Sequence, residues 1–328
     1  MKTYSPTAAS QRGMAIISAL LIAAVVAVIA GGMLSRQTVF TRALEAEQSR
    51  VQGAWMLQGA LEISRQWLWD AQQREPLIRL DQPWAQPLVM GPLGVGSRGF
   101  EGRLDDEQGK FNLRNLVANE RIDEEQLGHF QRLCELLGLN ATLSQRISQR
   151  VIASYPRLLN PDLANQAPLN HGFDSGRSTS PNAARKPLPP TRPMLRRVED
   201  LRGIEGITEA VLAKVTPFIT ILPANTWLNS NTATAPVLAA YVPGLSIERA
   251  QALIAERDAG QWFINRGDFV NRLRMPQLEL TTIKVGITSD WFRLRGQAGG
   301  EQRRVSLDAL LQRSADRLPR VIWSRVGV

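Results

Sequence analysis

The chain has 328 residues, and its 39 Lys+Arg against 30 Asp+Glu give a formal net charge of +9. This length indicates two domains or one domain with a large insertion, and a content of 44% hydrophobic and 21% charged residues argues against wholesale disorder. The single cysteine, Cys134, excludes an intramolecular disulfide, and only two histidines, His129 and His171, leave little for a histidine-rich centre. The charge is uneven from the start, because the first acidic residue is Glu45.

Residues 14–34 are uncharged and almost entirely apolar, and they follow a polar leader that contains Lys2 and Arg12. As a helix with a rise of about 1.5 Å per residue, this run spans about 30 Å, the thickness of the hydrocarbon core of a bilayer. The run therefore predicts a single membrane pass. The basic leader predicts a cytoplasmic N-terminus, with the bulk of the chain on the other side of the membrane.

Three interpretations of this segment compete. A cleaved secretory signal has a shorter apolar core of about 7–15 residues, although residues 28–30 offer a weak cleavage site. A generic signal anchor is the second interpretation. The third depends on Arg12-Gly13-Met14, which resembles the type III signal of type IV pilins and pseudopilins, where a prepilin peptidase cuts between Gly13 and Met14 and methylates Met14. We favour the third, because apolar residues continue at helical spacing to about residue 72 and predict one helix of about 90 Å.

The fifth residue of the mature chain, counted from Met14, is Ser18, where most pilins carry a glutamate. In that family the glutamate pairs with the N-terminal ammonium of the adjacent subunit, and an unpaired carboxylate in lipid costs several kcal/mol. A subunit at the tip of a filament has no subunit ahead of it to pair with. Ser18 is also compatible with a purely structural role, bonding to the carbonyl four residues earlier. Within a pilin-like helix, we interpret Ser18 as the mark of the tip position.

Four stretches extend the resemblance over nearly the whole chain: residues 12–21, 106–116, 228–233 and 289–292. Through them the chain resembles the general secretion pathway protein K family, the large minor pseudopilins of type II secretion. The resemblance implies an α+β fold, in which a long N-terminal helix packs on a small antiparallel sheet. It also implies a large all-α insertion containing helix-hairpin-helix or SAM-like units.

The expected organisation starts with a prepilin leader and a transmembrane segment, followed by a pilin-like head that the insertion interrupts. The predicted segments are 1–13 for the leader, 14–34 for the membrane span, 35–115 for the first part of the head, 116–282 for the insertion with a mobile Pro-rich loop at 160–195, and 283–328 for the C-terminal strands. Alternating residues on both sides of Gly-containing turns predict hairpins at about 99–114 and 283–307 and a last strand at 320–326.

Within the insertion, residues 123–139 predict a helix with His129 on the surface and Cys134 in the core, and we assign chemistry to neither. Ser144 is expected to cap a helix that runs through Ala153. Further helices are expected at about 208–215, at 247–258 with Ser246 as N-cap and Gly260 as its stop, and from Asp268. Asn229, Asn231 and Thr232 are expected to cap the first turn of another helix.

The main alternative function is suggested by the two helix-hairpin-helix-like units, because such hairpins contact phosphates in nucleic-acid binders. A membrane-anchored DNA-binding or DNA-uptake protein would share these features. However, residues 241–260 carry only two arginines, Arg249 and Arg257, against three acids, and residues 199–209 are also acidic. This charge balance argues against nucleic acid and favours a packing module.

No phosphate-binding loop, Gly-x-Ser-x-Gly or His-Glu-x-x-His motif occurs, so we expect no enzyme and no required cofactor. Calcium is compatible with the family resemblance. Asp105, Asp106 and Glu107 cluster at the expected hairpin tip, and such oxygen ligands suit Ca²⁺, although a solvated turn explains them equally well.

As a function, the resemblance implies a minor pseudopilin in the inner membrane of a Gram-negative bacterium, with its head in the periplasm. Such a subunit caps the tip of the pseudopilus and initiates its assembly for protein export through the outer membrane. The implied partners are the minor pseudopilins I and J, the major pseudopilin and the prepilin peptidase.

Overall fold

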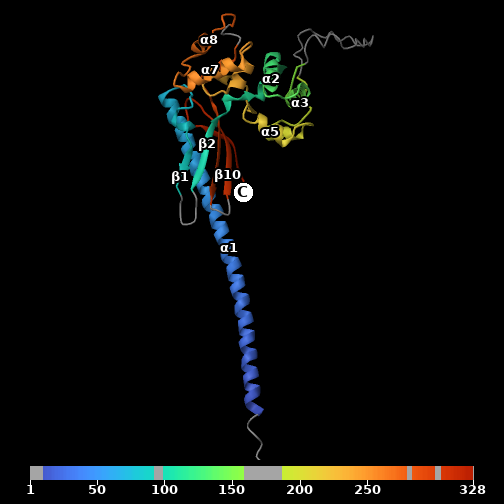
Figure 1. Cartoon of the computed structure of the whole chain (residues 1–328), viewed down its shortest axis with the longest axis vertical. Helices are drawn as coiled ribbons and strands as arrows, with labels where there is room; N and C mark the ends of the chain where they lie inside the picture. Colours follow the sequence, from blue (N-terminus) through green and yellow to red (C-terminus); the bar gives the residue numbers. More distant parts are fainter. Residues whose placement is uncertain (1–9, 92–98, 159–186, 279–282, 300–303, 328) are drawn as a thin grey trace, which may run out of the picture.

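A single long helix carries the head of the molecule at one end (Figure 1). The computed structural model of the chain describes residues 10–91, 99–158, 187–278, 283–299 and 304–327. Helix α1 runs from Ser10 to Arg74, and its 65 residues make it roughly 100 Å long. It ends two residues before Pro76, which cannot continue the helical hydrogen bonds. The predicted continuous helix over about 14–72 is thus confirmed.

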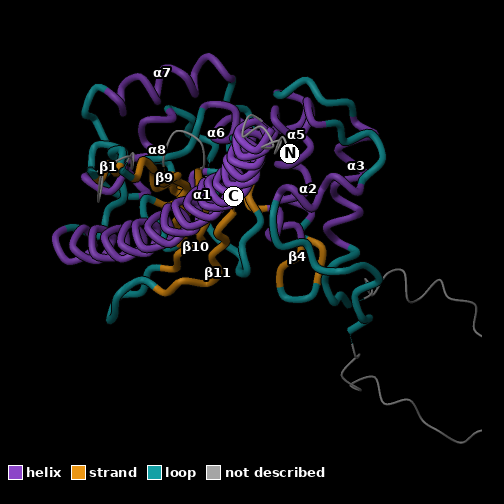
Figure 2. Tube along the Cα trace, turned by 90° about the horizontal axis from the view of Figure 1, so that it is seen from below, coloured by secondary structure: helices purple, strands orange, loops and turns teal. Residues whose placement is uncertain are grey.

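The last part of α1 packs on a five-stranded antiparallel sheet with the strand order β1-β2-β9-β10-β11. The strands are β1 (Leu88–Met90), β2 (Phe100–Asp106), β9 (Trp291–Gly299), β10 (Arg304–Gln312) and β11 (Arg320–Gly327). Figure 2 shows α1 crossing the sheet, and its contacts are mainly with β2, β9 and β10. The core of the head joins buried residues of α1 to those of the strands, among them Met56, Leu57, Ala60, Leu68, Phe292, Leu294, Leu307 and Leu311. The α+β fold is confirmed, as is the pairing of the strands within 283–307, although the first strand begins at Trp291 and Val285–Gly286 (β8) pairs elsewhere, with Leu228–Asn229 (β7).

The insertion leaves the head at the end of β2 and returns at the start of β9, and these two strands are neighbours in the sheet. Asp106 is the direct cross-strand partner of Phe292. The insertion therefore occupies the place of a hairpin turn. The predicted hairpin at 99–114 is wrong: β2 pairs with β1 and β9, whereas Phe111–Asn112 (β3) pairs in parallel with Ile219–Thr220 (β6) inside the insertion.

Two glycines let an aromatic ring lie flat across the sheet. Gly102 of β2 and Gly296 of β9 are cross-strand partners, and the Phe100 ring covers both. A Cβ atom on Gly296 would lie 2.3 Å from Phe100 Cζ, and one on Gly102 would lie 2.5 Å from the same atom. Both positions therefore require glycine because of close packing.

The insertion consists of short helices around its own core, which begins at Phe111 and ends at Val285. Its helices are α2 (Glu124–Leu136), α3 (Ala141–Ile152), α5 (Glu209–Val215), α6 (Ala235–Tyr241), α7 (Ile247–Asp258) and α8 (Arg266–Leu273). Short pairs β4 (Val117–Ala118) with β5 (Arg121–Ile122) and β7 (Leu228–Asn229) with β8 (Val285–Gly286), and the 3₁₀ turns Pro83–Ala85, Glu107–Gly109, Leu113–Leu116 and Val198–Gly203, complete the described elements.

Local capping chemistry sets several of these helix ends as predicted. Ser246 caps α7 by accepting from Arg249 N, and Gly260 follows the helix with a φ of 97°. The cap of α3, however, is Asn140, so the expected role of Ser144 is wrong; Ser144 lies one turn inside the helix and is buried. Serine and asparagine are both favourable N-cap residues, so residue type alone does not decide between Asn140 and Ser144. The cap is the residue at which the chain enters the helix.

The structure also bears on two other predictions, the surface position of His129 and the Pro-rich loop. His129 is only 7% exposed, because its ring lies 5.2 Å from that of Tyr241 on α6, so its predicted surface position is wrong; Cys134 is buried as predicted. Most of the expected loop at 160–195, with His171, lies outside the described residues. Its described end is held against α3, where Thr191 N donates to Ala153 O at 2.9 Å.

Candidate functional site

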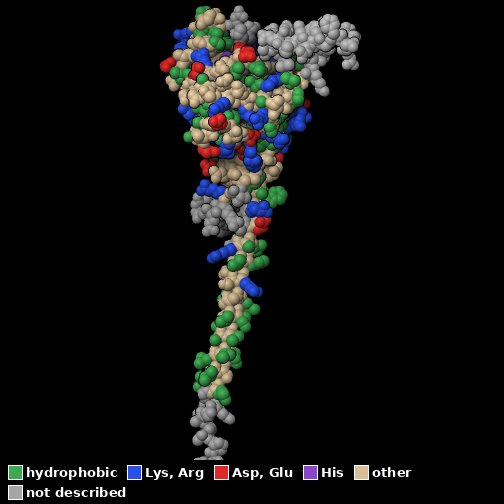
Figure 3. Space-filling view, turned by 90° about the vertical axis from the view of Figure 1, so that its right-hand side faces the viewer, with side chains coloured by type: hydrophobic (Ala, Val, Ile, Leu, Met, Phe, Trp, Pro, Cys, Tyr) green, Lys and Arg blue, Asp and Glu red, His purple; other side chains and the backbone are tan. Residues whose placement is uncertain are grey.

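The N-terminal half of α1 exposes apolar residues all around the helix. Ile16–Leu44 is long and apolar enough to cross a membrane, and its most apolar 18 residues have a mean hydropathy of 2.6, with none of them buried within the molecule. Figure 3 shows these side chains along the free part of the helix, with a few Lys or Arg side chains between them and the head. A helix with such a surface in water would be unstable, so it needs lipid or other helices around it.

An apolar stripe runs from the last residues of this segment towards the head. It consists of Phe40, Leu44, Val51 and Trp55, which are 70%, 59%, 44% and 69% exposed. At 100° per residue these four residues fall within about 60° of one another. By the same spacing, Ala60 and other buried residues of α1 lie on the opposite side, against the sheet. The stripe is therefore an outward face that the head leaves uncovered.

The predicted processing and tip-marker residues lie near the start of α1. Gly13 and Met14 fall within the first turns of the helix. The Ser18 hydroxyl donates to the Met14 carbonyl oxygen at 2.8 Å, the bond expected for its structural role. Its function as a tip marker stays a prediction, as does cleavage between Gly13 and Met14.

Where the head meets the insertion, Asp106 forms the centre of a buried polar junction. One carboxylate oxygen, Oδ1, accepts from Gln108 N at 2.8 Å. The other, Oδ2, accepts from the Thr232 and Ser289 hydroxyls, each at 2.6 Å, and from Asn229 Nδ2 at 3.0 Å. Burial raises the pKa of Asp106, while these four donors oppose the rise. The junction thus ties the end of β2 to two segments that are distant in sequence.

The asparagines expected as helix caps belong to this junction or to its surroundings. Asn229 is fully buried, and its amide also donates to Ser289 Oγ at 2.9 Å. Asn231 pairs with both backbone groups of Phe263, donating to its carbonyl and accepting from its N–H at 2.9 Å each. The helix that follows is capped at Thr234 without a side-chain bond. The predicted capping of that helix is therefore wrong: the Asn229 amide is used on Asp106 and Ser289, and the Asn231 amide on the distant Phe263 backbone. Locally, Asn229 Oδ1 accepts from Asn231 N, at 2.9 Å, before the helix begins.

The segment around Asp106 is fixed by further long-range bonds. Gln108 donates to Trp227 O at 3.1 Å and accepts from Asp290 N at 2.7 Å. Asn115 pairs with both backbone groups of Thr226, at 2.8 and 3.0 Å. Gly109 allows Thr232 to lie close to this segment, because a Cβ at position 109 would lie 2.8 Å from Thr232 Oγ1. The stretches 106–116, 228–233 and 289–292, which the sequence singled out separately, thus meet in one network.

The carboxylates considered for calcium point to different partners. Asp105 pairs with Arg295 and, at 3.2 Å, with Arg103. Glu107 accepts from Lys110 Nζ and Thr220 Oγ1, both at 2.5 Å, while Asp106 turns into the junction. Over the described ranges, no three His, Cys, Asp or Glu side chains are grouped to hold a metal ion. These residues do not fit a calcium site in this arrangement, and calcium binding by the family resemblance stays a prediction.

The arginines of the helix-hairpin-helix-like units are used inside the protein. Arg257 is 3% exposed and donates to Ser230 O and Ala233 O at 3.1 and 2.7 Å. Arg249 donates to Arg272 O at 3.2 Å, and Arg202 pairs with Glu209 at 2.7 Å. Since phosphate binding requires free cationic groups, this arrangement favours packing over nucleic-acid recognition.

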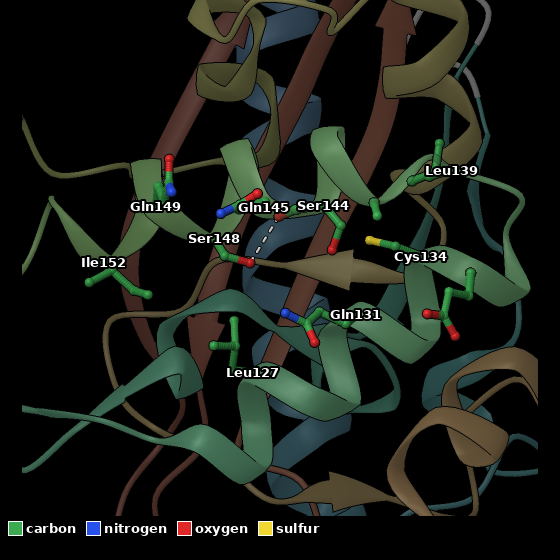
Figure 4. Close-up of a pocket in the computed structure, with 11 residues that line it drawn as sticks. Leu127, Gln131, Cys134, Leu139, Ser144, Gln145, Ser148, Gln149 and Ile152 are labelled. Carbon is green, nitrogen blue, oxygen red and sulfur yellow. Dashed lines mark hydrogen bonds between the residues drawn. The ribbon is translucent and has the colours of Figure 1, made fainter.

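A groove of about 390 Å³ separates α2 from α3 (Figure 4). Cys134 lies at its base, and Ser148 Oγ donates across one turn to Ser144 O at 2.9 Å. Burial raises the pKa of the Cys134 thiol to about 11, so it stays protonated at neutral pH and is a poor nucleophile. The groove suits packing rather than covalent chemistry.

Comparisons with known proteins agree with this architecture. Two family models, both described as type II secretion system (T2SS) protein K, match residues 109–224 and 228–288, together just over half of the chain. The chain belongs to the type II secretion system protein K family. The matched residues are those of the insertion, and Asp106, Gln108 and Ser289 of the junction lie just outside them. The sequence predicted this region only in part, because Gln108, Ser289 and Tyr241 gave no local signal of their roles.

Individual relatives extend the similarity to the whole chain. The type II secretion system protein K of Pseudomonas aeruginosa PAO1 is 27% identical over 97% of this chain and 93% of its own length. That of Pectobacterium carotovorum subsp. carotovorum is 25% identical over 88% of each. A chain in the crystal structure of the GspK-GspI-GspJ complex from the enterotoxigenic Escherichia coli type 2 secretion system has a TM-score of 0.62 at 19% identity, covering 87% of this chain and 99% of its own length.

Proposed function

We propose that the chain is the minor pseudopilin that caps the tip of the type II secretion pseudopilus and initiates its assembly for protein export through the outer membrane. It is anchored by one pass in the inner membrane of a Gram-negative bacterium, with its N-terminus in the cytoplasm and its head in the periplasm. The exposed apolar surface of α1, which is longer than a bilayer is thick, carries this proposal.

A membrane core of about 30 Å accommodates about 20 helical residues, so a span that starts near Met14 ends near Leu34. Phe40, Leu44, Val51 and Trp55 lie beyond that point and yet expose large apolar side chains. Lipid cannot cover them, and large apolar side chains exposed on one face of a helix in water mark an interaction surface. Helices of other pseudopilins have the shape and polarity to cover it, and a solved complex of GspK, GspI and GspJ includes a chain of this fold. We propose the minor pseudopilins I and J, then the major pseudopilin, as these partners.

The tip position is supported by Ser18 and by the breadth of the head. Ser18 uses its hydroxyl within its own helix and offers no carboxylate to a subunit ahead of it. The insertion lies at the end of the sheet farthest from the free part of α1 and extends to one side of it (Figure 1), so the head is much broader than the helix that carries it. The role is mechanical and requires neither catalysis nor a cofactor. A prepilin peptidase releases the leader at Gly13 and methylates Met14.

The test is co-expression of the full chain with the prepilin peptidase and the minor pseudopilins I and J, followed by purification from membranes in detergent. We expect co-purification and a mature chain that begins with N-methyl-Met14. Phe40→Gln, on the stripe, should reduce co-purification, whereas Val39→Gln, equally exposed on another side of α1, should not. An N-terminus at Gly31 would contradict the proposal, and salt-dependent binding of duplex DNA would favour the DNA-binding alternative.

A further inference from the structure

Strand β11 forms a long free edge of the sheet. It lies beside β10 at the rim (Figure 2), and within the described residues no strand pairs with its other edge. At eight residues β11 is far longer than the opposite edge strand β1, which has three. Its sequence is rich in β-branched and aromatic residues and contains no proline. An exposed edge of this kind offers unpaired backbone groups to another strand.

A bulge in β11 sorts its side chains into two faces. Arg320, Trp323 and Arg325 lie opposite Gln312, Leu310 and Asp308 of β10, while Val321, Ser324 and Val326 lie opposite Leu311, Ala309 and Leu307. The register shift between Leu310 and Leu311 skips Ile322, and this brings both arginines to the same face despite their odd spacing. The arginine face is the one turned away from α1, because Leu311, Ala309 and Leu307 belong to the core beneath α1.

Both faces of β11 have side chains that the rest of the described chain leaves exposed or unpaired. Val321 and Val326 remain 36% and 55% exposed, because α1 packs mainly on β2, β9 and β10. On the other face, Asp308 is already paired with Arg293 at 2.6 Å. Neither Arg320 nor Arg325 has an ion pair among the described residues, and residues 317–328 contain three arginines and no acid. One row of the edge therefore offers exposed Val321 and Val326 on either side of Ser324. The other offers Arg320 and Arg325 on either side of Trp323, which packs on the cluster of Leu222, Trp291 and Leu310.

We propose that β11 is the docking edge for an extended strand of another protein whose residues alternate between acidic and apolar. Backbone hydrogen bonds extend the sheet by one strand. The acidic side chains of the incoming strand face Arg320 and Arg325, and its apolar side chains continue the row of Val321 and Val326. A second copy of this chain is a poor occupant, because residues 317–328 contain no acidic side chain that could face Arg320 and Arg325.

The test uses the full chain in detergent micelles and a fluorescent eight-residue peptide that alternates glutamate with valine. We expect saturable binding by fluorescence anisotropy and slower hydrogen exchange of the β11 amides when the peptide is bound. A peptide with lysine in place of glutamate should bind at least roughly tenfold more weakly, since opposite-charge cross-strand pairs become like-charge pairs. A glutamate peptide N-methylated at alternate residues should not bind.

Charge reversal on the protein locates the site. The double variant Arg320→Glu/Arg325→Glu should weaken binding by roughly tenfold or more. The matched control Arg121→Glu/Arg192→Glu makes the same change of net charge at exposed residues of the insertion and should leave binding unchanged. The proposal is overturned if the glutamate peptide does not bind, if the lysine peptide binds equally well, if the control variant loses as much affinity, or if exchange in β11 is unaffected.

Discussion

Replacing Asp106 with asparagine removes the charge at the centre of the junction while keeping the shape of the side chain. In Asp106→Asn, an amide NH2 group, which can only donate, takes the place of Oδ2, which accepts from Thr232, Ser289 and Asn229. The two hydroxyls can rotate and become acceptors, but the Asn229 amide cannot. Leaving the buried Asn229 amide without this acceptor costs about 1–3 kcal/mol whatever the charge on Asp106, so the free energy of unfolding should fall by about 1–3 kcal/mol.

This effect can be measured by urea denaturation of the full chain in micelles, followed by tryptophan fluorescence. Asp105→Asn is the matched control: it removes the neighbouring carboxylate, whose partners Arg103 and Arg295 are 66% and 36% exposed, and should cost at most about 1 kcal/mol. If the two variants lose equal stability, or if Asp106→Asn stays within about 0.5 kcal/mol of the parent, the junction does not hold the insertion as argued.

The parent protein and Asp106→Asn should also differ in how their stability depends on pH. Burial raises the pKa of folded Asp106 above its unfolded value of about 3.9, so the folded state binds the proton more tightly. The stability due to this group is therefore fully present at low pH and is lost as the pH rises through the folded pKa. Asparagine does not ionise, so the stability difference between parent and Asp106→Asn should be larger near about pH 4 than near about pH 8. A difference that grows with pH would refute the reasoning.

Two further predictions concern the packing of the insertion and the head. Burial lowers the pKa of His129, so an NMR titration should place its midpoint below the ordinary value of about 6.5, and acidification through that midpoint should lower stability; a midpoint at or above 6.5 would contradict the buried position. Gly296→Ala should lower the thermal stability by about 1–3 kcal/mol, because the new methyl group meets the Phe100 ring, whereas Gly128→Ala, with nothing within 4 Å, should be neutral or stabilising.

The elements that could be predicted from the sequence are those whose evidence is local. The apolar spacing of α1 persists over its whole length, and α7 has a serine cap and a glycine stop within a few residues of its apolar stripe. Only four residues separate the end of β9 from the start of β10 in the sequence, so their pairing is also local. Periodicity and capping chemistry were sufficient in these cases.

The elements that were missed depend on contacts between residues distant in sequence. The Asp-Glu-Gln-Gly stretch at 106–109 has the composition of a hairpin turn, yet Gly109 is there for the approach of Thr232, more than a hundred residues away. Similarly, the polar spacing of α2 gives no sign that Tyr241 covers His129. Asn229 and Asn231 have the residue type of caps, and only the fold reveals that they satisfy a carboxylate and a distant backbone.

The position of the insertion at the β2–β9 turn has a consequence for how this protein can be redesigned. Its two attachment points lie as close together as those of an ordinary hairpin, since Asp106 faces Phe292 directly across the sheet. The register of β2 against β9 is therefore independent of how many residues lie between them. A short turn in place of residues 107–290 would yield a slim subunit with an unchanged α1 surface, provided that Asp106, and also Trp291 and Leu310, which lose their contact with Leu222 of the insertion, are replaced by residues suited to solvent. The insertion, which gives the head its width, is in this sense a module that can be replaced without changing α1.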